Sequence, residues 1–135
     1  MSTKTEQRRI LVINDTPDIV ELFHDILSDE GYHVVSDVFP INPTAKLAEI
    51  KGDRPHLIIL DLIIGGEPLG FQFLQMLKMD RTTHQIPVIL CTAAHQQAAE
   101  MEAHLLEMGV AVVLKPFDID ALLAEVAKAW DQRVH

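Results

Sequence analysis

The sequence predicts an α/β protein with an open, five-stranded parallel sheet and helices on both faces. Short β-branched apolar runs alternate along the chain with stretches in which apolar residues recur every three or four positions. The 135 residues suit one domain, and 48% hydrophobic with 23% charged residues is a globular composition. Alternation of strand and helix patterns in one domain favours a parallel sheet connected by right-handed crossovers.

Five apolar runs are expected to form buried strands. Nearly continuous apolar runs fit a parallel sheet that is covered on both faces, whereas strict alternation fits a sheet with one wet face. No run approaches the roughly 18 residues of a membrane span. The expected strands cover residues 10–13, 34–38, 57–60, 88–90 and 110–114.

The intervening stretches are expected to form five helices. Their apolar positions lie within residues 19–27, 43–50, 71–79, 98–108 and 119–130. Thr16 and Pro17 are expected to start the first helix, and Asp118 to cap the last. Glycines that follow a helical stretch favour helix ends, so Gly31, Gly52 and Gly109 are expected to end the first, second and fourth helices.

The charge balance restricts the classes of partner. Lys and Arg number 11 against 20 Asp and Glu, a formal charge of −9 that repels nucleic-acid backbones and anionic membrane surfaces. The single Cys91 excludes an internal disulfide and suits a reducing cytoplasm. We expect a flexible tail over residues 1–8, one domain over residues 9–133 without an output domain, and a cytoplasmic location.

Polar residues stand where the predicted strands end. Asn14 and Asp15 follow the first strand, Asp61 the third, Thr92 the fourth and Lys115 the fifth. The carboxyl ends of parallel strands meet at one edge of a sheet, which is where sites of such folds lie. Two carboxylates favour a Mg²⁺ site, and a lysine beside them suits a phosphate group.

The chain resembles the receiver domains of two-component response regulators, of the chemotaxis-protein-Y type. Four segments, at residues 10–15 (ILVIND), 57–62 (LIILDL), 88–93 (VILCTA) and 114–117 (LKPF), carry the resemblance, which extends from about Arg9 to about Trp130. It implies a flavodoxin-like sheet with strand order 2-1-3-4-5. It also implies a phosphorylated signalling protein and not an enzyme, with at most Mg²⁺-dependent self-phosphorylation and slow self-dephosphorylation.

The resemblance assigns roles residue by residue. Asp61 matches the acceptor of a phosphoryl group from a histidine kinase or a histidine phosphotransfer protein. Thr92 matches the switch hydroxyl and Lys115 the lysine that pairs with the phosphoryl group, with a Lys115–Pro116 bond that is often cis. For Mg²⁺, the implied ligands are Asp15, Asp61, the backbone carbonyl of Ile63 and, through water, Asn14.

Four positions depart from the family pattern. Asn14 replaces the first acid of the acidic pair, so we expect weaker Mg²⁺ binding. Val112 replaces the aromatic switch residue, so signalling to the face of the fourth helix, fifth strand and fifth helix is expected to depend on backbone movement. Ile63 and Ala94 occupy positions that tune the lifetime of the phosphoryl group, and since neither orients water we expect slow self-dephosphorylation.

Other functions remain open beside the phosphoryl switch. A receiver-like interaction module that works without phosphorylation is the main alternative, favoured by Asn14 and Val112. A small α/β enzyme is disfavoured because residues 14–16 hold neither an Asp-x-Asp pair nor a phosphate loop. Seven scattered histidines lack zinc spacing, and His24 or His104 as a phosphodonor is less favoured than Asp61 as an acceptor. Docking to an unidentified protein, or homodimerisation, is the expected output.

Overall fold

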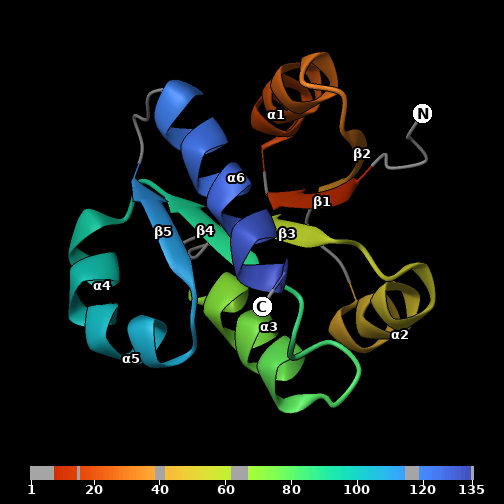
Figure 1. Ribbon diagram of the computed structural model, residues 1–135. Coiled ribbons are helices and arrows are strands. Elements are labelled where there is room, and N and C mark those ends of the chain that lie inside the picture. Colours follow the sequence, from red (N-terminus) through yellow and green to blue (C-terminus); the bar gives the residue numbers. More distant parts are fainter. Residues whose placement is uncertain (1–7, 15, 39–41, 62–66, 115–118, 135) are drawn as a thin grey trace.

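The computed structural model describes residues 8–14, 16–38, 42–61, 67–114 and 119–134. Within them, five parallel strands form one sheet in the order β2-β1-β3-β4-β5, which confirms the predicted fold class and strand order (Figure 1). The strands are β1 (Arg9–Asn14), β2 (His33–Val38), β3 (Leu57–Leu60), β4 (Val88–Thr92) and β5 (Ala111–Leu114).

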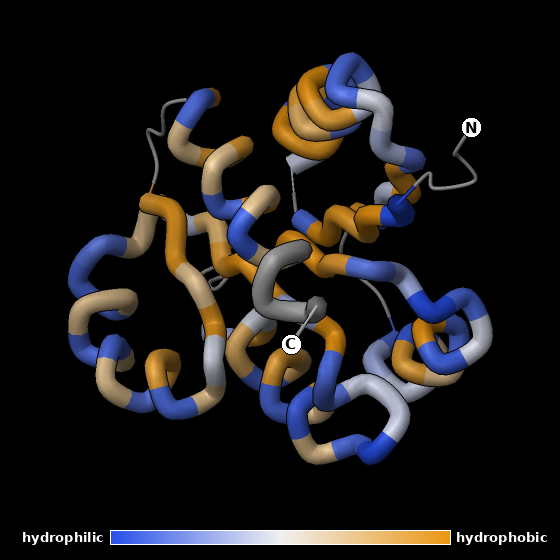
Figure 2. The backbone as a smooth tube through the Cα atoms, in the orientation of Figure 1, coloured by the Kyte–Doolittle hydropathy of each residue, from blue (hydrophilic) through white to orange (hydrophobic). Residues whose placement is uncertain are grey.

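Two helical layers cover the sheet, and residues alternate between them along each strand. Ile10 and Val12 of β1 join one core with α1 and α6, while Leu11 and Ile13 join the other core with α2, α3, α4 and α5. Figure 2 shows hydrophobic residues along the strands, the edge strand β5 included, and on parts of the helices such as α1. The helices are α1 (Pro17–Asp29), α2 (Pro43–Asp53), α3 (Leu69–Met79), α4 (His95–Glu100), α5 (Glu102–Glu107) and α6 (Ile119–Val134).

The outer strands are less buried than the sequence predicts. β1, β3 and β4 are buried along almost their whole length, but in β2 only Val34 is buried and in β5 only Val113. Strands form at both predicted places, but the prediction that they are buried along their length was wrong. An apolar run does not reveal which strands lie at the sheet edge, where one side lacks a neighbouring strand.

Two predicted helix ends are confirmed and one is wrong. Gly31 and Gly109 adopt positive φ values of 93° and 72° after α1 and α5, and the amide hydrogen bonds there form Schellman turns. Gly52, by contrast, lies inside α2, which continues to Asp53. Arg54 follows the helix in the left-handed conformation, with φ 50°, and its N–H donates to the Ile50 carbonyl. Pro55 disfavours continuation of the helix through Arg54.

The predicted fourth helix is divided into α4 and α5. Met101 separates them with φ −98° and ψ 0°, and its N–H contacts the carbonyls of both Gln97 and Ala98. This tightened turn is not readable from apolar spacing, which continues through Met101 into Leu105. Among the described residues, no helix combines the length and apolarity needed to cross a membrane.

Candidate functional site

Three central strands deliver polar side chains to the carboxyl edge of the sheet. Ile13 pairs with Leu60, and Leu60 with Leu90, so Asn14, Asp61 and Thr92 end neighbouring strands. The Asp61 N–H continues the ladder by donating to the Ile13 carbonyl at 3.2 Å. The sequence prediction that these three residues meet at one edge agrees with this register.

All three side chains are buried, although each carries a polar group. Asn14, Asp61 and Thr92 are 2%, 7% and 1% exposed. Burial of a polar group is unfavourable unless the group is hydrogen-bonded, so hydrogen bonds are expected to hold these side chains in defined orientations.

Asn14 connects the first loop to Asp61. Its Nδ2 donates to Asp61 Oδ2 at 3.3 Å, and its Oδ1 accepts from the Thr16 N–H at 3.0 Å. The two contacts fix the amide orientation, since only the oxygen can accept and only the nitrogen can donate. An aspartate in place of Asn14 would instead set two carboxylates side by side, and the amide avoids this repulsion next to the buried Asp61.

The donor set suits Mg²⁺ in part. Asp61 contributes a carboxylate, and Mg²⁺ is commonly held by one or two carboxylates together with waters. The Asn14 oxygen faces Thr16 while its nitrogen faces Asp61. A water-mediated role for Asn14 would therefore use the second lone pair of its oxygen or a turned amide.

Thr92 is held by the loop that follows β4. Its Oγ1 accepts from the Ala94 N–H at 3.0 Å, which closes a turn at the start of α4. A hydroxyl that accepts in this way keeps its O–H as a donor. Thr92 can therefore offer a hydrogen bond at the same edge as the Asp61 carboxylate.

Several predicted features lie outside the described residues. They are Asp15, Ile63, Lys115, the Lys115–Pro116 bond, the cap at Asp118, and residues 1–7 of the tail. Among the residues that are described, no group of three or more His, Cys, Asp or Glu side chains is arranged to hold a metal ion.

A hollow of about 420 Å³ lies on the face that the sequence analysis predicts as the docking surface. It is lined by residues of α4, α5, β5 and α6, among them Leu106 and Leu114, which are 71% and 41% exposed. The half-buried Val112 also lines it and packs against the core beneath. Val112, which replaces the aromatic switch residue, therefore contacts both the hollow and the hydrophobic core.

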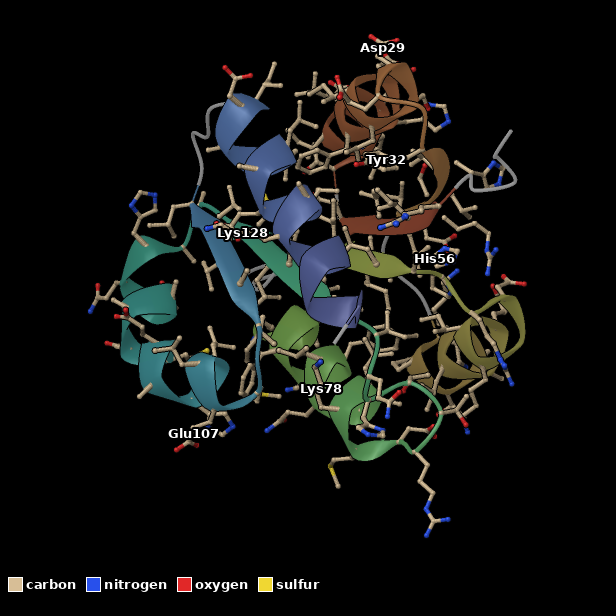
Figure 3. The ribbon with its side chains drawn as sticks, viewed as in Figure 1. Asp29, Tyr32, His56, Lys78, Glu107 and Lys128 are labelled. Atoms are coloured by element: carbon tan, nitrogen blue, oxygen red, sulfur yellow. The ribbon has the colours of Figure 1, made fainter. Side chains whose placement is uncertain are left out.

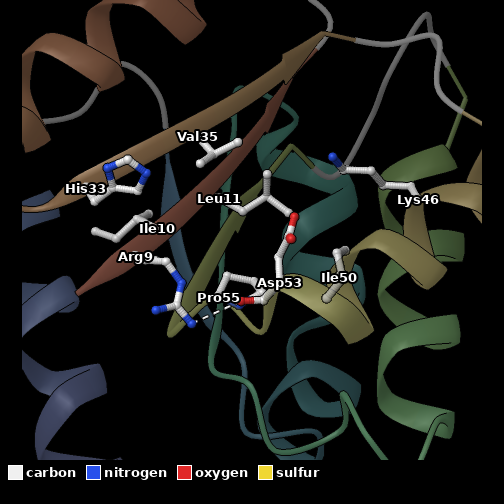
Figure 4. A pocket seen from close by; sticks show the side chains of 9 residues that line it. All are labelled: Arg9, Ile10, Leu11, His33, Val35, Lys46, Ile50, Asp53 and Pro55. Atoms are coloured by element: carbon white, nitrogen blue, oxygen red, sulfur yellow. Dashed lines mark hydrogen bonds between the residues drawn. The ribbon is translucent and has the colours of Figure 1, made fainter. Parts of the chain in front are cut away.

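Lys46 is a buried cation that the sequence analysis missed. It lies on α2, contacts the Asp37 carboxylate of β2 and donates to Glu49 at 3.2 Å. Burial opposes the charge of Lys46, but the contacts with Asp37 and Glu49 outweigh it and raise the pKa of the ammonium above 10.5. Figure 4 shows Lys46 beside a cavity of about 240 Å³ between α2 and β2. Lys46 lies four residues before Ile50, so the two share one face of α2, and this spacing could have indicated that Lys46 is buried. Lysine side chains are usually exposed to solvent, however, so the spacing alone does not predict burial.

Comparison with known proteins gives a family match over most of the chain. Residues 10–127 match the response regulator receiver domain. The chain is 38% identical to the response regulator PleD of Caulobacter vibrioides and 31% identical to the nitrogen assimilation regulatory protein NtrX of Azorhizobium caulinodans. These alignments cover 87% and 90% of this chain but 25% and 26% of the relatives, so the chain spans about a quarter of their length.

The fold also matches solved structures. A CheY-like receiver domain protein from Methanospirillum hungatei superposes with a TM-score of 0.78 at 23% identity, covering 95% of this chain and 97% of the other. At that identity the likeness concerns the fold.

Proposed function

The chain belongs to the response regulator receiver domain family of two-component systems, and we propose that it is a signalling switch phosphorylated on Asp61. The phosphoryl group would come from a histidine kinase or a histidine phosphotransfer protein. The observation that carries the proposal is the meeting of buried Asp61, Asn14 and Thr92 at the carboxyl edge of β1, β3 and β4.

The proposed step is a phosphoryl transfer between two side chains. An Asp61 carboxylate oxygen forms a bond to phosphorus while the bond from phosphorus to the donor's imidazole nitrogen breaks. The electron pair returns to that ring nitrogen, so the donor histidine is regenerated. Asp61 suits this role because the strand ladder and the Asn14 amide fix its position, and transfer of this kind depends chiefly on placement and charge stabilisation.

Mg²⁺ would offset the charge on the transferred oxygens. Asp61 would hold it together with Asp15, the Ile63 carbonyl and water, and Asn14 through water. Lys115 would pair with a phosphoryl oxygen. Because Asn14 is neutral, we propose that Mg²⁺ binds more weakly here than at a site with two adjacent acids.

Phosphorylation would be reported to the surface through Thr92. A phosphoryl group adds roughly 1.5 to 2 negative charges near neutral pH and three acceptor oxygens. The Thr92 O–H is a donor at that edge, and Thr92 pairs with Leu114 of β5 through the strand register. We propose that movement of Thr92 changes the face formed by α4, α5, β5 and α6, where a protein partner or a second copy would dock.

Three features of the proposal concern the whole protein. The receiver domain would span residues 9–133, following a tail over residues 1–8. It would act in the cytoplasm and pass its signal by protein contact. It would not be an enzyme beyond its own phosphorylation and dephosphorylation.

A second candidate is an interaction module that is never phosphorylated. The observation that favours it is the Asn14–Asp61 hydrogen bond, which satisfies one Asp61 oxygen without a metal. Under this function, Asn14 and Asp61 would stabilise one fixed shape of the docking face.

Incubation with acetyl phosphate and Mg²⁺, followed by intact-protein mass measurement, separates the two candidates. We expect the wild-type chain to gain one phosphoryl group and Asp61→Ala to gain none. Asp25→Ala is the matched control, since it removes an exposed carboxylate from α1, and it should be phosphorylated like the wild type. Absence of any mass gain in the wild-type chain would favour the unphosphorylated module.

The lifetime of the phosphoryl group gives a further test. Ala94 follows Thr92 by two positions and has a methyl side chain that cannot orient water. We therefore propose slow self-dephosphorylation, measured as the decay of the added mass after removal of acetyl phosphate. A half-life of seconds at neutral pH would contradict this.

A further inference from the structure

The amino edge of the sheet, opposite the candidate phosphorylation site, carries a polar pocket. Its volume is about 570 Å³, and among the described residues its lining comes from the start of β1, the segment before β3 and the loop before β4. We call it the amino-edge pocket. Its lining residues are Arg9, Arg54, Pro55, His56, Thr82, Gln85 and Ile86.

We propose that the amino-edge pocket binds a small molecule that carries a phosphate or diphosphate group. The polar side chains that line it are two arginines, a histidine, a threonine and a glutamine, and none of the lining residues is acidic. Guanidinium groups match the geometry of phosphate oxygens with paired donors.

Arg9 is already positioned for this role. Its Nη2 donates to the carbonyls of Asp53 and Arg54 at 3.0 and 2.6 Å, so the end of α2 fixes the guanidinium. Figure 4 shows the contact from Arg9 to Asp53, with the Asp53 carboxylate turned away from the guanidinium. Since one nitrogen is engaged, the other N–H groups of Arg9 are donors whose position is set before a ligand arrives, which lowers the entropy lost on binding.

Contacts with Arg9 set the ring orientation of His56 at the edge of the pocket. Its Nδ1 accepts the Arg9 backbone N–H at 2.9 Å, and its backbone N–H donates to the Arg9 carbonyl at 2.8 Å. A ring nitrogen that accepts cannot carry the proton, so a neutral His56 carries it on Nε2. Figure 3 labels His56 between the β3 and α2 ribbons.

Arg54 supplies the observation that distinguishes this pocket from a chance basic surface. It is the one non-glycine residue with positive φ among those described. An arginine in the left-handed conformation is strained, and a glycine there would relieve the strain. An arginine nevertheless occupies this position, and it lines the pocket.

The local and overall charges together favour a small ligand over an extended polyanion. The nearby Asp80 carboxylate is balanced by Lys51 at 2.8 Å and accepts from the Thr82 N–H at 2.8 Å, so its charge is partly offset. The whole chain, however, carries −9. Nucleic acid or an anionic bilayer would meet that acidic surface, whereas a phosphate-bearing small molecule contacts the pocket alone.

Titration of the full chain with inorganic pyrophosphate, in EDTA to exclude Mg²⁺, tests the proposal. Calorimetry gives the affinity, and amide NMR shifts locate the ligand. We expect shifts at His56, Thr82 and Gln85, and none at Asp61 or Thr92. Shifts confined to the Asp61 edge, or no saturable binding, would overturn it.

Arg54→Gly is the informative variant because it removes the guanidinium and relieves the backbone strain, so the fold is retained. We expect pyrophosphate affinity about tenfold weaker, as loss of a charge-assisted hydrogen bond predicts, with thermal stability equal to or above that of the wild type. Lys128→Ala, which removes one exposed positive charge from α6, should change the affinity less than twofold.

Equal weakening by Arg54→Gly and Lys128→Ala would indicate bulk charge and overturn the proposal. So would unchanged binding by Arg54→Gly. Two further arms identify the source of the phosphate, using a short single-stranded oligonucleotide and phosphatidylserine vesicles. Tighter binding of either than of pyrophosphate would contradict a small-molecule ligand.

Discussion

The polar side chains at the two ends of the central strands differ in burial. At the carboxyl end, Asn14, Asp61 and Thr92 are buried and bonded to one another or to the following loop. At the amino end, Arg54, Thr82 and Gln85 are exposed around an open pocket. A buried carboxylate suits covalent capture of a phosphoryl group, and exposed cations suit reversible binding of one. The buried polar groups at one edge of the sheet and the exposed ones at the other are thus suited to different chemistry.

Two lysines show a similar difference between the ends of the sheet. Lys46 lies near the carboxyl edge and Lys78 near the amino edge. Lys46 contacts Asp37, next to the last residue of β2, and its pKa is raised. Lys78 precedes β4, donates to the carbonyls of His84 and Ile86, and has a pKa lowered by burial. Carbonyl partners do not offset the loss of hydration as carboxylates do.

The largest expected effect on stability is that of Lys46→Met. We expect a loss of about 1–2 kcal/mol at neutral pH, because Asp37 and Glu49 lose their partner while solvent screens part of the interaction. The folded-state pKa of Lys46 lies above 10.5, so its contribution is full below 10.5 and disappears as the pH rises through that higher value. Urea denaturation from about pH 8 to about pH 11.5 should show the gap to wild type narrowing.

Lys78→Met should show the opposite pH trend. The lowered folded-state pKa means that the charged form of Lys78 is disfavoured in the fold, so wild-type stability gains relative to the variant as the pH rises towards 10.5. The same urea series measures this. If the stability difference from wild type changed with pH in the same direction for Lys46→Met and Lys78→Met, the opposite pKa shifts of the two lysines would be refuted.

Asn14→Asp tests the carboxyl end directly. We expect Mg²⁺ affinity to rise about tenfold, equivalent to about 1.4 kcal/mol, because a further carboxylate would join Asp15 and Asp61 at the proposed site. Without Mg²⁺ the variant should unfold more readily than the wild type, since the amide donor to Asp61 is replaced by a like charge. Mg²⁺ titration and thermal unfolding with and without Mg²⁺ provide the measurements, and unchanged affinity would refute the role given to Asn14.

The smallest expected effect concerns α2, whose end contacts Arg9 at the amino edge. Gly52 lies within the helix, and no atom outside its own turn lies within 4 Å of the place that an added Cβ would take. Gly52→Ala should therefore stabilise the fold by about 0.5–1 kcal/mol. Gly31→Ala is the matched control, since φ 93° there opposes an alanine and predicts destabilisation. Thermal unfolding of both variants checks the pair, and two shifts of the same sign would contradict it.

Sequence reasoning predicted the centre of this molecule better than its periphery. Residues 57–60 form a strand as predicted, and Asp61 follows it at the predicted edge, because an apolar run that must be buried on both faces leaves one arrangement. The expected end of α2 at Gly52 was wrong because Pro55 and the Arg9 contacts, rather than glycine, define that end.

The sequence by itself predicted the succession of strands and helices along the chain and the burial of the central strands on both faces. It also predicted that Asn14, Asp61 and Thr92 reach one edge of the sheet. These features follow from local periodicity and from the geometry of parallel strands. Three other features required the folded chain: Asn14 turns its nitrogen towards Asp61, Lys46 is buried against Asp37, and one pocket gathers the side chains of two arginines and a histidine. Each of these depends on contacts between residues distant along the chain, or on a backbone angle that no periodic pattern records.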